Sequence, residues 1–194
     1  MPSTGSNQPA SSAASLAVMT DERLMLMFRT GDAEAFAVLF RRYNDPIYGF
    51  FRRRLENQSR AEELAQETFV AILRGIKRYE PRSTFRTYLY GIAIKILMAE
   101  RRKSRIVQST AMPASDRGID SSVDAAIWVR RAIEQLDSDH RDVLLLREYE
   151  QLSYEEIAQL LGLPLNTVRS RLFRARSALK AFLLPLRPET RNEQ

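Results

Sequence analysis

A short segment near the carboxyl end constrains the fold more than any other part of the sequence; it reads LSYEEIAQLLGLPLNTVRSRLFRARSAL. Ser153, followed three residues later by Glu156, forms a capping box, in which each residue satisfies a backbone N–H of the other. A helix is therefore expected from Ser153 to Leu161. Gly162 suits the left-handed conformation that closes a helix. The next three residues, Leu163-Pro164-Leu165, predict a tight turn.

A second helix is expected after this turn, with Asn166 or Thr167 as its cap. At about 100° per residue, four apolar side chains share roughly a 60° arc, which is the expected buried side; they are Val168, Leu172, Ala175 and Leu179. Polar and aromatic side chains project from the opposite side, namely Arg169, Ser170, Phe173, Arg174 and Ser177. Two short helices joined in this way predict a helix-turn-helix.

The arginines of the second helix point to a nucleic-acid partner. The formal net charge of the chain is +6, and arginine pairs well with phosphate. In a helix-turn-helix the second helix enters the major groove, so Ser170 and either Arg169 or Arg171 are expected to reach base edges. Arg174 and Arg176 are expected to hold phosphates. The structural alternative is a helical hairpin with a solvated arginine face, because charge runs usually mean no more than that. For Phe173, contact with a thymine methyl and packing on a neighbouring helix remain open.

The rest of the chain predicts an all-α fold, with two small helical domains joined by a flexible linker and a helix-turn-helix in the C-terminal one. Only seven glycines and eight prolines are present, which argues against a turn-rich β protein. The expected order is a disordered tail at 1–20, a helical domain at 21–103, a linker at 104–122, the helix-turn-helix domain at 123–186 and a tail at 187–194. A flexible linker of this length spans about 24 Å on average, so it cannot fix the distance between two binding sites.

Within the first domain, helices are expected at about 21–28, from Asp32 onward, at about 60–79 and at about 83–103. Pro46 should kink or interrupt the second of these helices near Asn44–Asp45. The fourth helix should bury a seam made of Phe85, Leu89, Ile92 and Ile96. In the second domain the expected helices cover about 123–136, 138–149, 153–161 and 166–184.

Two segments of the first domain carry a family resemblance: DAEAFAVLFRRYNDPIYGFFRRRL and AEELAQETFVAILRGIKRYEPRSTFRTYLYGIAIKILMAERRK. They resemble region 2 of the extracytoplasmic-function (ECF) sigma factors of bacterial RNA polymerase, and the helix-turn-helix half resembles region 4. The likeness covers nearly everything from Asp32 to Leu183. It implies a transcription initiation factor that binds core RNA polymerase and promoter DNA.

The resemblance also assigns site residues. Those matching the stretch that grips the polymerase clamp are Glu62, Glu63, Gln66, Glu67 and Phe69; acids at a helix start also favour the helix dipole, which is the structural alternative. Those matching the segment that melts and captures the minus-ten element are Arg82, Arg86, Tyr88, Tyr90, Lys95, Arg101, Arg102 and Lys103. Those facing the minus-35 element are Asn166, Thr167, Arg169, Ser170, Arg171, Phe173, Arg174 and Arg176.

The chain departs from the family pattern at three positions of the minus-ten segment. Tyr88 stands where the family usually has tryptophan, and because it borders the expected buried seam, core packing is favoured over base stacking. Lys95 and Ala99 stand where asparagine and aspartate are usual. Lysine only donates hydrogen bonds, whereas asparagine also accepts them, so base preference at the minus-ten element should differ.

Two other classes of function compete with this one. A stand-alone helix-turn-helix regulator would bind DNA tightly without polymerase. An enzyme is disfavoured because His140 is the only histidine, there is no cysteine, and Glu62, Glu63 and Glu67 have no second ligand cluster beside them. We therefore expect no catalytic residues, metal, cofactor or small-molecule substrate. No secretory or membrane-spanning segment is expected, which predicts a cytoplasmic protein. Only the resemblance implies an anti-sigma factor as a further partner.

Overall fold

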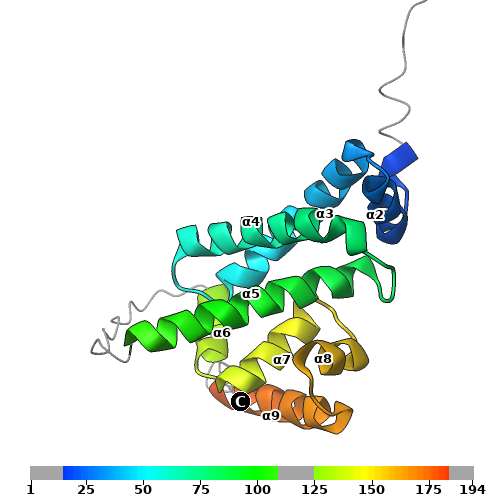
Figure 1. The fold of residues 1–194 in the computed structure, drawn as a ribbon. Helices are drawn as coiled ribbons and strands as arrows, with labels where there is room; N and C mark the ends of the chain where they lie inside the picture. Colours follow the sequence, from blue (N-terminus) through cyan, green and yellow to red (C-terminus); the bar gives the residue numbers. More distant parts are fainter. Residues whose placement is uncertain (1–14, 109–124, 184–194) are drawn as a thin grey trace, which may run out of the picture. The chain divides into compact units, whose positions relative to one another are not determined.

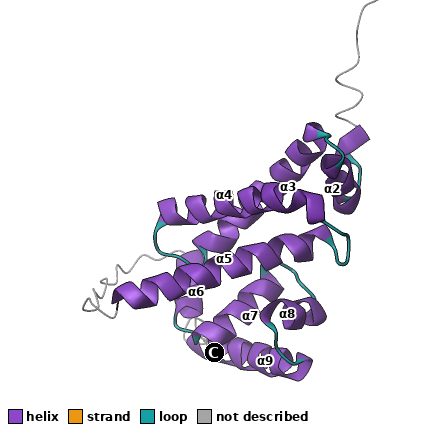
Figure 2. Ribbon diagram, viewed as in Figure 1, coloured by secondary structure: helices purple, strands orange, loops and turns teal. Residues whose placement is uncertain are grey.

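The computed structural model describes residues 15–108 and 125–183, and these are helical segments joined by short loops, with no strand among them (Figures 1 and 2). The chain divides into two compact units, Met1–Ala111 (unit 1) and Met112–Gln194 (unit 2). The predicted all-α fold class is confirmed. None of the described helices is long and apolar enough to cross a membrane.

In the described part of unit 1, the main elements are α2 (Asp21–Arg29), α3 (Ala33–Arg52), α4 (Gln58–Gly75), the short 3₁₀ turn η1 (Ile76–Arg78) and α5 (Phe85–Gln108), and residues 15–17 before α2 are helical as well. Helices α2, α3 and α4 start at capping side chains, since Thr20, Asp32 and Asn57 each accept a hydrogen bond from a backbone N–H of the first turn. Helix α4 packs against both α3 and α5, and α2 packs against α3.

Pro46 was predicted to kink or interrupt the helix; α3 continues through it, so the predicted interruption is wrong. A proline inside a helix removes one backbone hydrogen bond and costs stability. Here the cost is offset by burial on both sides of the exposed Pro46, because Leu39, Ile47, Phe50 and Phe51 have no exposed surface. Packing of an apolar face, more than local propensity, decides whether a helix persists.

The start of α5 agrees with prediction, because the Thr84 hydroxyl accepts from the backbone N–H of Thr87 at 3.2 Å. The Glu22 carboxylate of α2 accepts from the backbone N–H of Phe85 at 2.7 Å, which satisfies a second free donor of this helix end. The end of α5 differs from prediction. The helix runs to Gln108, so residues 104–108, expected in the linker, are helical.

The buried seam of α5 also differs from the prediction, in its second half. Phe85 and Leu89 are fully buried, as expected. Ile92 and Ile96 are only half-buried, and the stripe continues instead through residues spaced by four, namely Ala93 and Leu97. Helix α5 contacts α2, α3 and α4, so its buried surface is wider than a single arc. Tyr90 and Ile94 are buried as well.

The segment before α2 was expected to be disordered up to Thr20, and this is wrong for residues 15–20. Leu16 is 3% exposed. The Arg42 guanidinium of α3 donates to the backbone oxygens of Ala17 at 2.6 Å and Met19 at 3.0 Å, and it also pairs with Asp21. These contacts order the segment against α3. The rest of the predicted tail lies outside the described residues.

Unit 2 contains α6 (Ala125–Glu134), α7 (Ser138–Glu148), α8 (Tyr154–Leu161) and α9 (Leu165–Leu183). Helix α9 contacts the other three, and its Val168, Leu172 and Ala175 are buried as predicted, while Leu179 is half-buried. The expected start of α6 at residue 123, the linker from residue 109 on and the tail at 187–194 lie outside the described residues.

The helix-turn-helix has the predicted geometry. Ser153 accepts from the backbone N–H of Glu156 at 3.1 Å, and the Glu156 carboxylate accepts from the backbone N–H of Ser153 at 2.8 Å. Gly162 closes α8 in the left-handed conformation, with a φ of 64°. The predicted cap of α9 is wrong by two or three positions. Helical hydrogen bonding starts at the Pro164 carbonyl, so Asn166 and Thr167 lie inside the first turn.

Candidate functional site

The exposed side of α9 carries most of the residues predicted to face duplex DNA. Arg169, Ser170, Phe173 and Arg174 are exposed together with Asn166, and Phe173 stands out with 73% of its surface accessible. We call these five residues the recognition face. Thr167, also predicted here, is half-buried, and its backbone oxygen accepts a hydrogen bond from the Ser170 hydroxyl at 3.0 Å.

Two of the predicted arginines are bound to acids of α7 instead. Arg171 Nη2 lies 2.6 Å from Asp139 Oδ2, and Arg176 Nη2 lies 2.6 Å from Glu148 Oε1. At about 100° per residue, these two arginines flank the buried stripe of α9 on opposite sides. The hydrogen bond to Glu148 raises the pKa of Arg176 above its usual value. The arginines at the edges of the helix therefore fasten it to α7.

Arg169 and Arg174 have no carboxylate partner among the described residues. Arg169 makes only a long contact of 3.5 Å to the Asn166 side chain, and Arg174 is exposed. Arginines without an acid beside them can direct their N–H donors to phosphates or guanine edges. The structure thus divides the arginine run into a free pair and a fastened pair, a division that the sequence pattern left open.

A shallow groove runs beside the recognition face. Its lining includes Phe173, Arg176 and Lys180 of α9 together with Tyr154 of α8. Sequence reasoning missed Tyr154, whose ring lies 5.3 Å from the Arg147 guanidinium. Tyr154 directly follows the capping residue Ser153 and so lies at the start of α8. This position was the signal in the sequence that could have indicated a place for Tyr154 beside α9.

In unit 1 the four predicted polar residues of α4 are exposed. These residues are Glu62, Glu63, Gln66 and Glu67. Helix α4 begins at Gln58, so none of its acids lies in the first turn. The helix dipole acts mainly on the terminal turn, and the dipole explanation for these acids is correspondingly weakened.

Arg60 joins this acidic surface to α5, and sequence reasoning missed it. Its guanidinium donates to both carboxylate oxygens of Glu100, at 2.8 Å and 2.7 Å, and to Glu63 at 2.6 Å. Glu67 lies 3.4 Å away. The hydrogen bonds from Arg60 lower the pKa of Glu100. The spacing of three between Arg60 and Glu63 could have indicated one of these pairs, but only the fold brings Glu100 to the same guanidinium.

Phe69 was predicted to contact the polymerase, and its burial contradicts this. The side chain is 4% exposed, with its ring centroid 4.8 Å from that of Phe40 and 6.4 Å from that of Phe36. It belongs to the interior between α3 and α4. The large apolar side chains of α4 that are exposed are Val70 at 39% and Leu73 at 41%.

The predicted minus-ten residues are divided by their burial. Tyr90 is 2% exposed and packs 5.7 Å from Phe50, so it cannot stack on a base, which corrects the prediction. Tyr88 is half-buried with its ring 5.1 Å from Tyr79, and burial raises its pKa. These contacts fit the packing role that the sequence favoured for Tyr88.

The cations of the same segment lie on more than one side of α5. Lys95, Arg102 and Lys103 are exposed, whereas Arg86 and Arg101 are half-buried. Tyr88, Lys95 and Arg102 are spaced by seven residues, which places them on one face of the helix. Arg82, in the loop before α5, is exposed and pairs with Glu80 at 2.7 Å. No group of acidic or histidine side chains suited to a metal is found among the described residues.

Comparisons with known proteins agree with this arrangement. The family model "Sigma-70 region 2" matches residues 39–106, and "Sigma-70, region 4" matches residues 126–179. The chain is 36% identical over 183 residues to the RNA polymerase sigma-H factor of Pseudomonas aeruginosa, covering 86% of this chain and 95% of that protein. It is 31% identical over 185 residues to the ECF RNA polymerase sigma-E factor of Escherichia coli, covering 87% and 96%.

Two solved structures share the fold. The sigma factor RpoE of Bartonella quintana, in complex with the anti-sigma factor NepR, matches with a TM-score of 0.66 at 22% identity, covering 78% of this chain and 98% of that one. CnrH, in complex with the cytosolic domain of CnrY, matches with a TM-score of 0.65 at 24% identity, covering 87% and 99%. Both sigma-70 regions are present in order, and close relatives match along most of the chain, so this protein belongs to the extracytoplasmic-function sigma factors, a group of bacterial transcription initiation factors.

Proposed function

We propose that the recognition face of α9 reads the minus-35 element in the major groove. The observation that carries this proposal is the exposure of Arg169, Ser170, Phe173 and Arg174 on the sides of α9 that lie away from the buried stripe. Arginine donors suit guanine edges and phosphates, and an exposed ring suits a thymine methyl. Arg171 and Arg176 are assigned mainly to holding α9 on α7.

A pair of single substitutions tests this division. Arg174→Ala should weaken promoter binding by the holoenzyme about ten- to a hundredfold, which corresponds to one lost base or phosphate contact. Arg171→Ala is the matched control, because it removes an identical side chain three positions away that is bound to Asp139. It should lower the stability of unit 2 and change promoter affinity by less than threefold. Equal losses for both variants would contradict the assignment.

In unit 1 we propose two further surfaces. Lys95, Arg102 and Lys103, exposed on α5, would follow the backbone of the melted minus-ten strand, since single-strand sites need cations along the chain. Glu62, Glu63, Gln66 and Glu67, exposed on α4, would contact the clamp of core RNA polymerase. Replacing Glu63 and Gln66 with Ala should weaken binding to core enzyme without altering the recognition face.

Transcription in vitro tests the whole proposal. Core polymerase supplemented with this protein should yield promoter-dependent transcripts whose start sites share minus-35 and minus-ten elements at a fixed spacing. The protein alone should bind the same promoters weakly, because each unit offers only a small surface. Tight, specific binding by the isolated protein would favour a stand-alone regulator instead.

We further propose that the protein works in the cytoplasm, without catalytic chemistry or a cofactor of its own, and that an anti-sigma factor holds it inactive. One similar structure is a sigma factor in complex with an anti-sigma factor, and another is CnrH in complex with the cytosolic domain of CnrY. Co-purification from cells grown without stress, followed by identification of the bound protein, tests the last point; recovery of the sigma factor only with polymerase would contradict it.

A further inference from the structure

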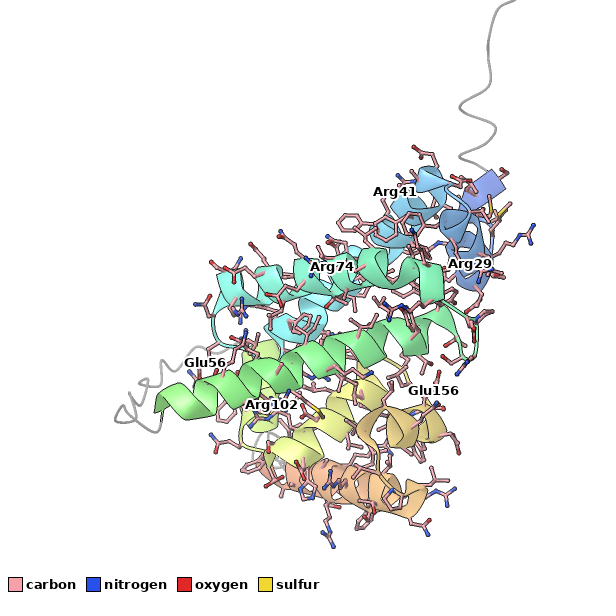
Figure 3. All side chains as sticks on the ribbon, in the orientation of Figure 1. Arg29, Arg41, Glu56, Arg74, Arg102 and Glu156 are labelled. Atoms are coloured by element: carbon pink, nitrogen blue, oxygen red, sulfur yellow. The ribbon has the colours of Figure 1, made fainter. Side chains whose placement is uncertain are left out.

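Helix α2 holds both ends of the loop that joins η1 to α5. This loop comprises residues 79–84, and we call it the connecting loop. At its start, Arg29 Nη1 donates to the backbone oxygen of Tyr79 at 2.9 Å. At its end, the Glu22 carboxylate accepts from the backbone N–H of Phe85 at 2.7 Å. Figure 3 labels Arg29 on α2, at the end of unit 1 where the chain turns into α5.

These two side chains, which we call the α2 pair, come from one face of one helix. Glu22 and Arg29 are seven residues apart, so they lie on the same side of α2, about 10 Å apart along its axis. Met25 lies between them on that side and is fully buried, and α2 contacts both η1 and α5. The α2 pair therefore extends from a packed helix to the two points at which the connecting loop begins and ends.

The connecting loop is exposed between two buried anchors. Tyr79 is 3% exposed and Phe85 has no exposed surface, whereas Glu80, Pro81 and Arg82 are exposed. The side chain of Arg82 is the most open of these that carries a positive charge, with 85% of its surface accessible. Burial of the two rings holds the ends of the loop in place, and a hydrogen bond to a peptide group also fixes the direction in which the backbone leaves. The α2 pair supplies such a bond at each end.

We propose that the α2 pair sets the shape in which the connecting loop meets the melted minus-ten strand, so that Glu22 and Arg29 are positioning residues for promoter opening. The inference rests on the proposed minus-ten contact of unit 1 and adds a role for α2. Loops carry binding residues where a rigid scaffold positions them. A loop that already has its bound shape loses less conformational freedom on binding. Arg82, near the middle of the loop, is the charged group positioned in this way.

Two simpler explanations of the α2 pair predict different behaviour. Its charges suit the dipole of α2, since Glu22 lies in the first turn and Arg29 in the last, but a dipole effect requires no contact with the connecting loop. Arg29 is also exposed, so it could bind a phosphate itself. In that case removal of Glu22, which is negatively charged, should leave promoter opening unchanged or make it faster.

The rate of promoter opening by the holoenzyme tests the proposal, measured by the fluorescence of 2-aminopurine placed in the minus-ten element. Glu22→Ala and Arg29→Ala should each slow opening at least fivefold. The double variant should be slowed by less than the product of the two single effects, because either change releases the same loop. Arg23→Ala is the matched control, since Arg23 is exposed on α2 and its guanidinium has no hydrogen-bond partner among the described residues. It should change the rate by less than twofold. Equal slowing by Arg23→Ala, or an unchanged rate for Glu22→Ala, would overturn the inference.

Base preference separates positioning from stability. Selection of open promoters from a library with a randomised minus-ten element should show an altered preference for Glu22→Ala and for Arg29→Ala. Glu22→Gln keeps an acceptor for the backbone N–H of Phe85 and should restore most of the original preference. Asn57→Ala removes the cap of α4, at the end of that helix away from the connecting loop, so it should lower stability and leave the preference unchanged. Thermal unfolding shows whether each variant is folded at the assay temperature. An equal change for Asn57→Ala, or no restoration by Glu22→Gln, would overturn the inference.

A variant of α5 distinguishes failure of this inference from failure of the proposed function. Lys95→Ala with Arg102→Ala removes two exposed cations that are assigned to the minus-ten strand. If this variant slows promoter opening while the variants of the α2 pair do not, only the positioning role is wrong. If neither slows opening, the minus-ten assignment of unit 1 is wrong as well.

Discussion

In unit 1, phenylalanine fills the interior: Phe50, Phe51 and Phe85 have no exposed surface. In unit 2, by contrast, every aromatic side chain of the described residues reaches solvent. Trp128, Tyr149, Phe173 and Phe182 are each more than a third exposed, and Tyr154 is half-buried. The interior of unit 2 consists of aliphatic side chains, such as Leu145 and Leu172.

This difference indicates how each unit combines stability with binding. Aromatic rings bury large areas, and most rings of unit 1 lie in its interior, with Phe40 as an exception at 40% exposed. The helices of unit 2 pack through aliphatic side chains, which leaves its rings available for contacts with a partner. Substituting an aromatic residue should therefore affect folding in unit 1 and binding in unit 2.

The largest expected effect comes from Phe85→Ala in unit 1. Removing a fully buried ring typically costs about 3–5 kcal/mol, and Phe85 also packs 5.3 Å from Tyr43. Thermal unfolding followed by the helical signal in circular dichroism should show that one part of the protein unfolds at a lower temperature than in the native protein. Trp128 is the only tryptophan and belongs to unit 2, so the transition seen by its fluorescence should stay unchanged. A shift of the tryptophan transition by the same amount would contradict the contrast between the two units.

The next effect comes from Arg60→Gln, which separates α4 from Glu100 of α5. Hydrogen bonds to charged groups contribute about 1.5–3 kcal/mol, so unit 1 should lose about 2 kcal/mol. The matched control in unit 2 is Arg130→Gln, whose pair with Glu134 is exposed on both sides. Exposed pairs contribute less than about 1 kcal/mol, and chemical denaturation monitored for each unit checks both values.

The Arg60 pair also predicts a dependence on pH. Because Arg60 lowers the pKa of Glu100 in the folded protein, its contribution is fully present above the ordinary glutamate pKa of about 4.3. It is lost as the pH falls through the lowered pKa. The difference in stability between the native protein and Arg60→Gln should therefore shrink below about pH 4.3. A difference that grows under acid conditions would contradict the assignment.

A smaller effect is expected for Ser153→Ala, which removes the cap of α8. Loss of such a cap costs about 1 kcal/mol, and it should appear in the tryptophan transition because α8 belongs to unit 2. Ser177→Ala serves as the control, since Ser177 is exposed within α9. Alanine favours helix at that position, so stability there should stay the same or rise slightly.

The smallest effect on stability is expected for Phe173→Ala. Its ring is 73% exposed, and surface substitutions usually change stability by less than about 0.5 kcal/mol. Promoter binding by the holoenzyme should nevertheless weaken. If Phe173→Ala lowered the stability of unit 2 as much as Phe85→Ala lowers that of unit 1, the contrast between the two interiors would be wrong.

Local chemistry made much of the fold predictable from the sequence. The capping box of Ser153 and Glu156 and the left-handed Gly162 depend on residues close together in the chain, and both were predicted correctly. The helix expected from Asp32 onward also begins there. The same holds for the buried stripe of α9. Pro46 was misjudged because local propensity predicts a break, while burial of residues far apart in sequence keeps α3 intact.

The site was harder to predict because exposure depends on which helices surround a residue. A resemblance places Phe69 and Tyr90 in functional segments, but it does not show that α3 covers one and Phe50 the other. The division of the α9 arginines has the same origin. Asp139 and Glu148 lie about thirty residues before their partners, so no local pattern links them to Arg171 and Arg176.

The two ion pairs between α7 and α9 have a mechanical consequence. A helix held by an ion pair on each side resists rotation about its long axis, because rotation in either direction stretches one of these two grips. The direction in which Arg174 points is thus fixed before any promoter arrives, and little torsional freedom is left to lose on docking. Cutting only one grip, at Asp139 or at Glu148, should leave the helix held by its buried stripe and by the remaining pair, whereas cutting both should let it turn and shift its register on the bases.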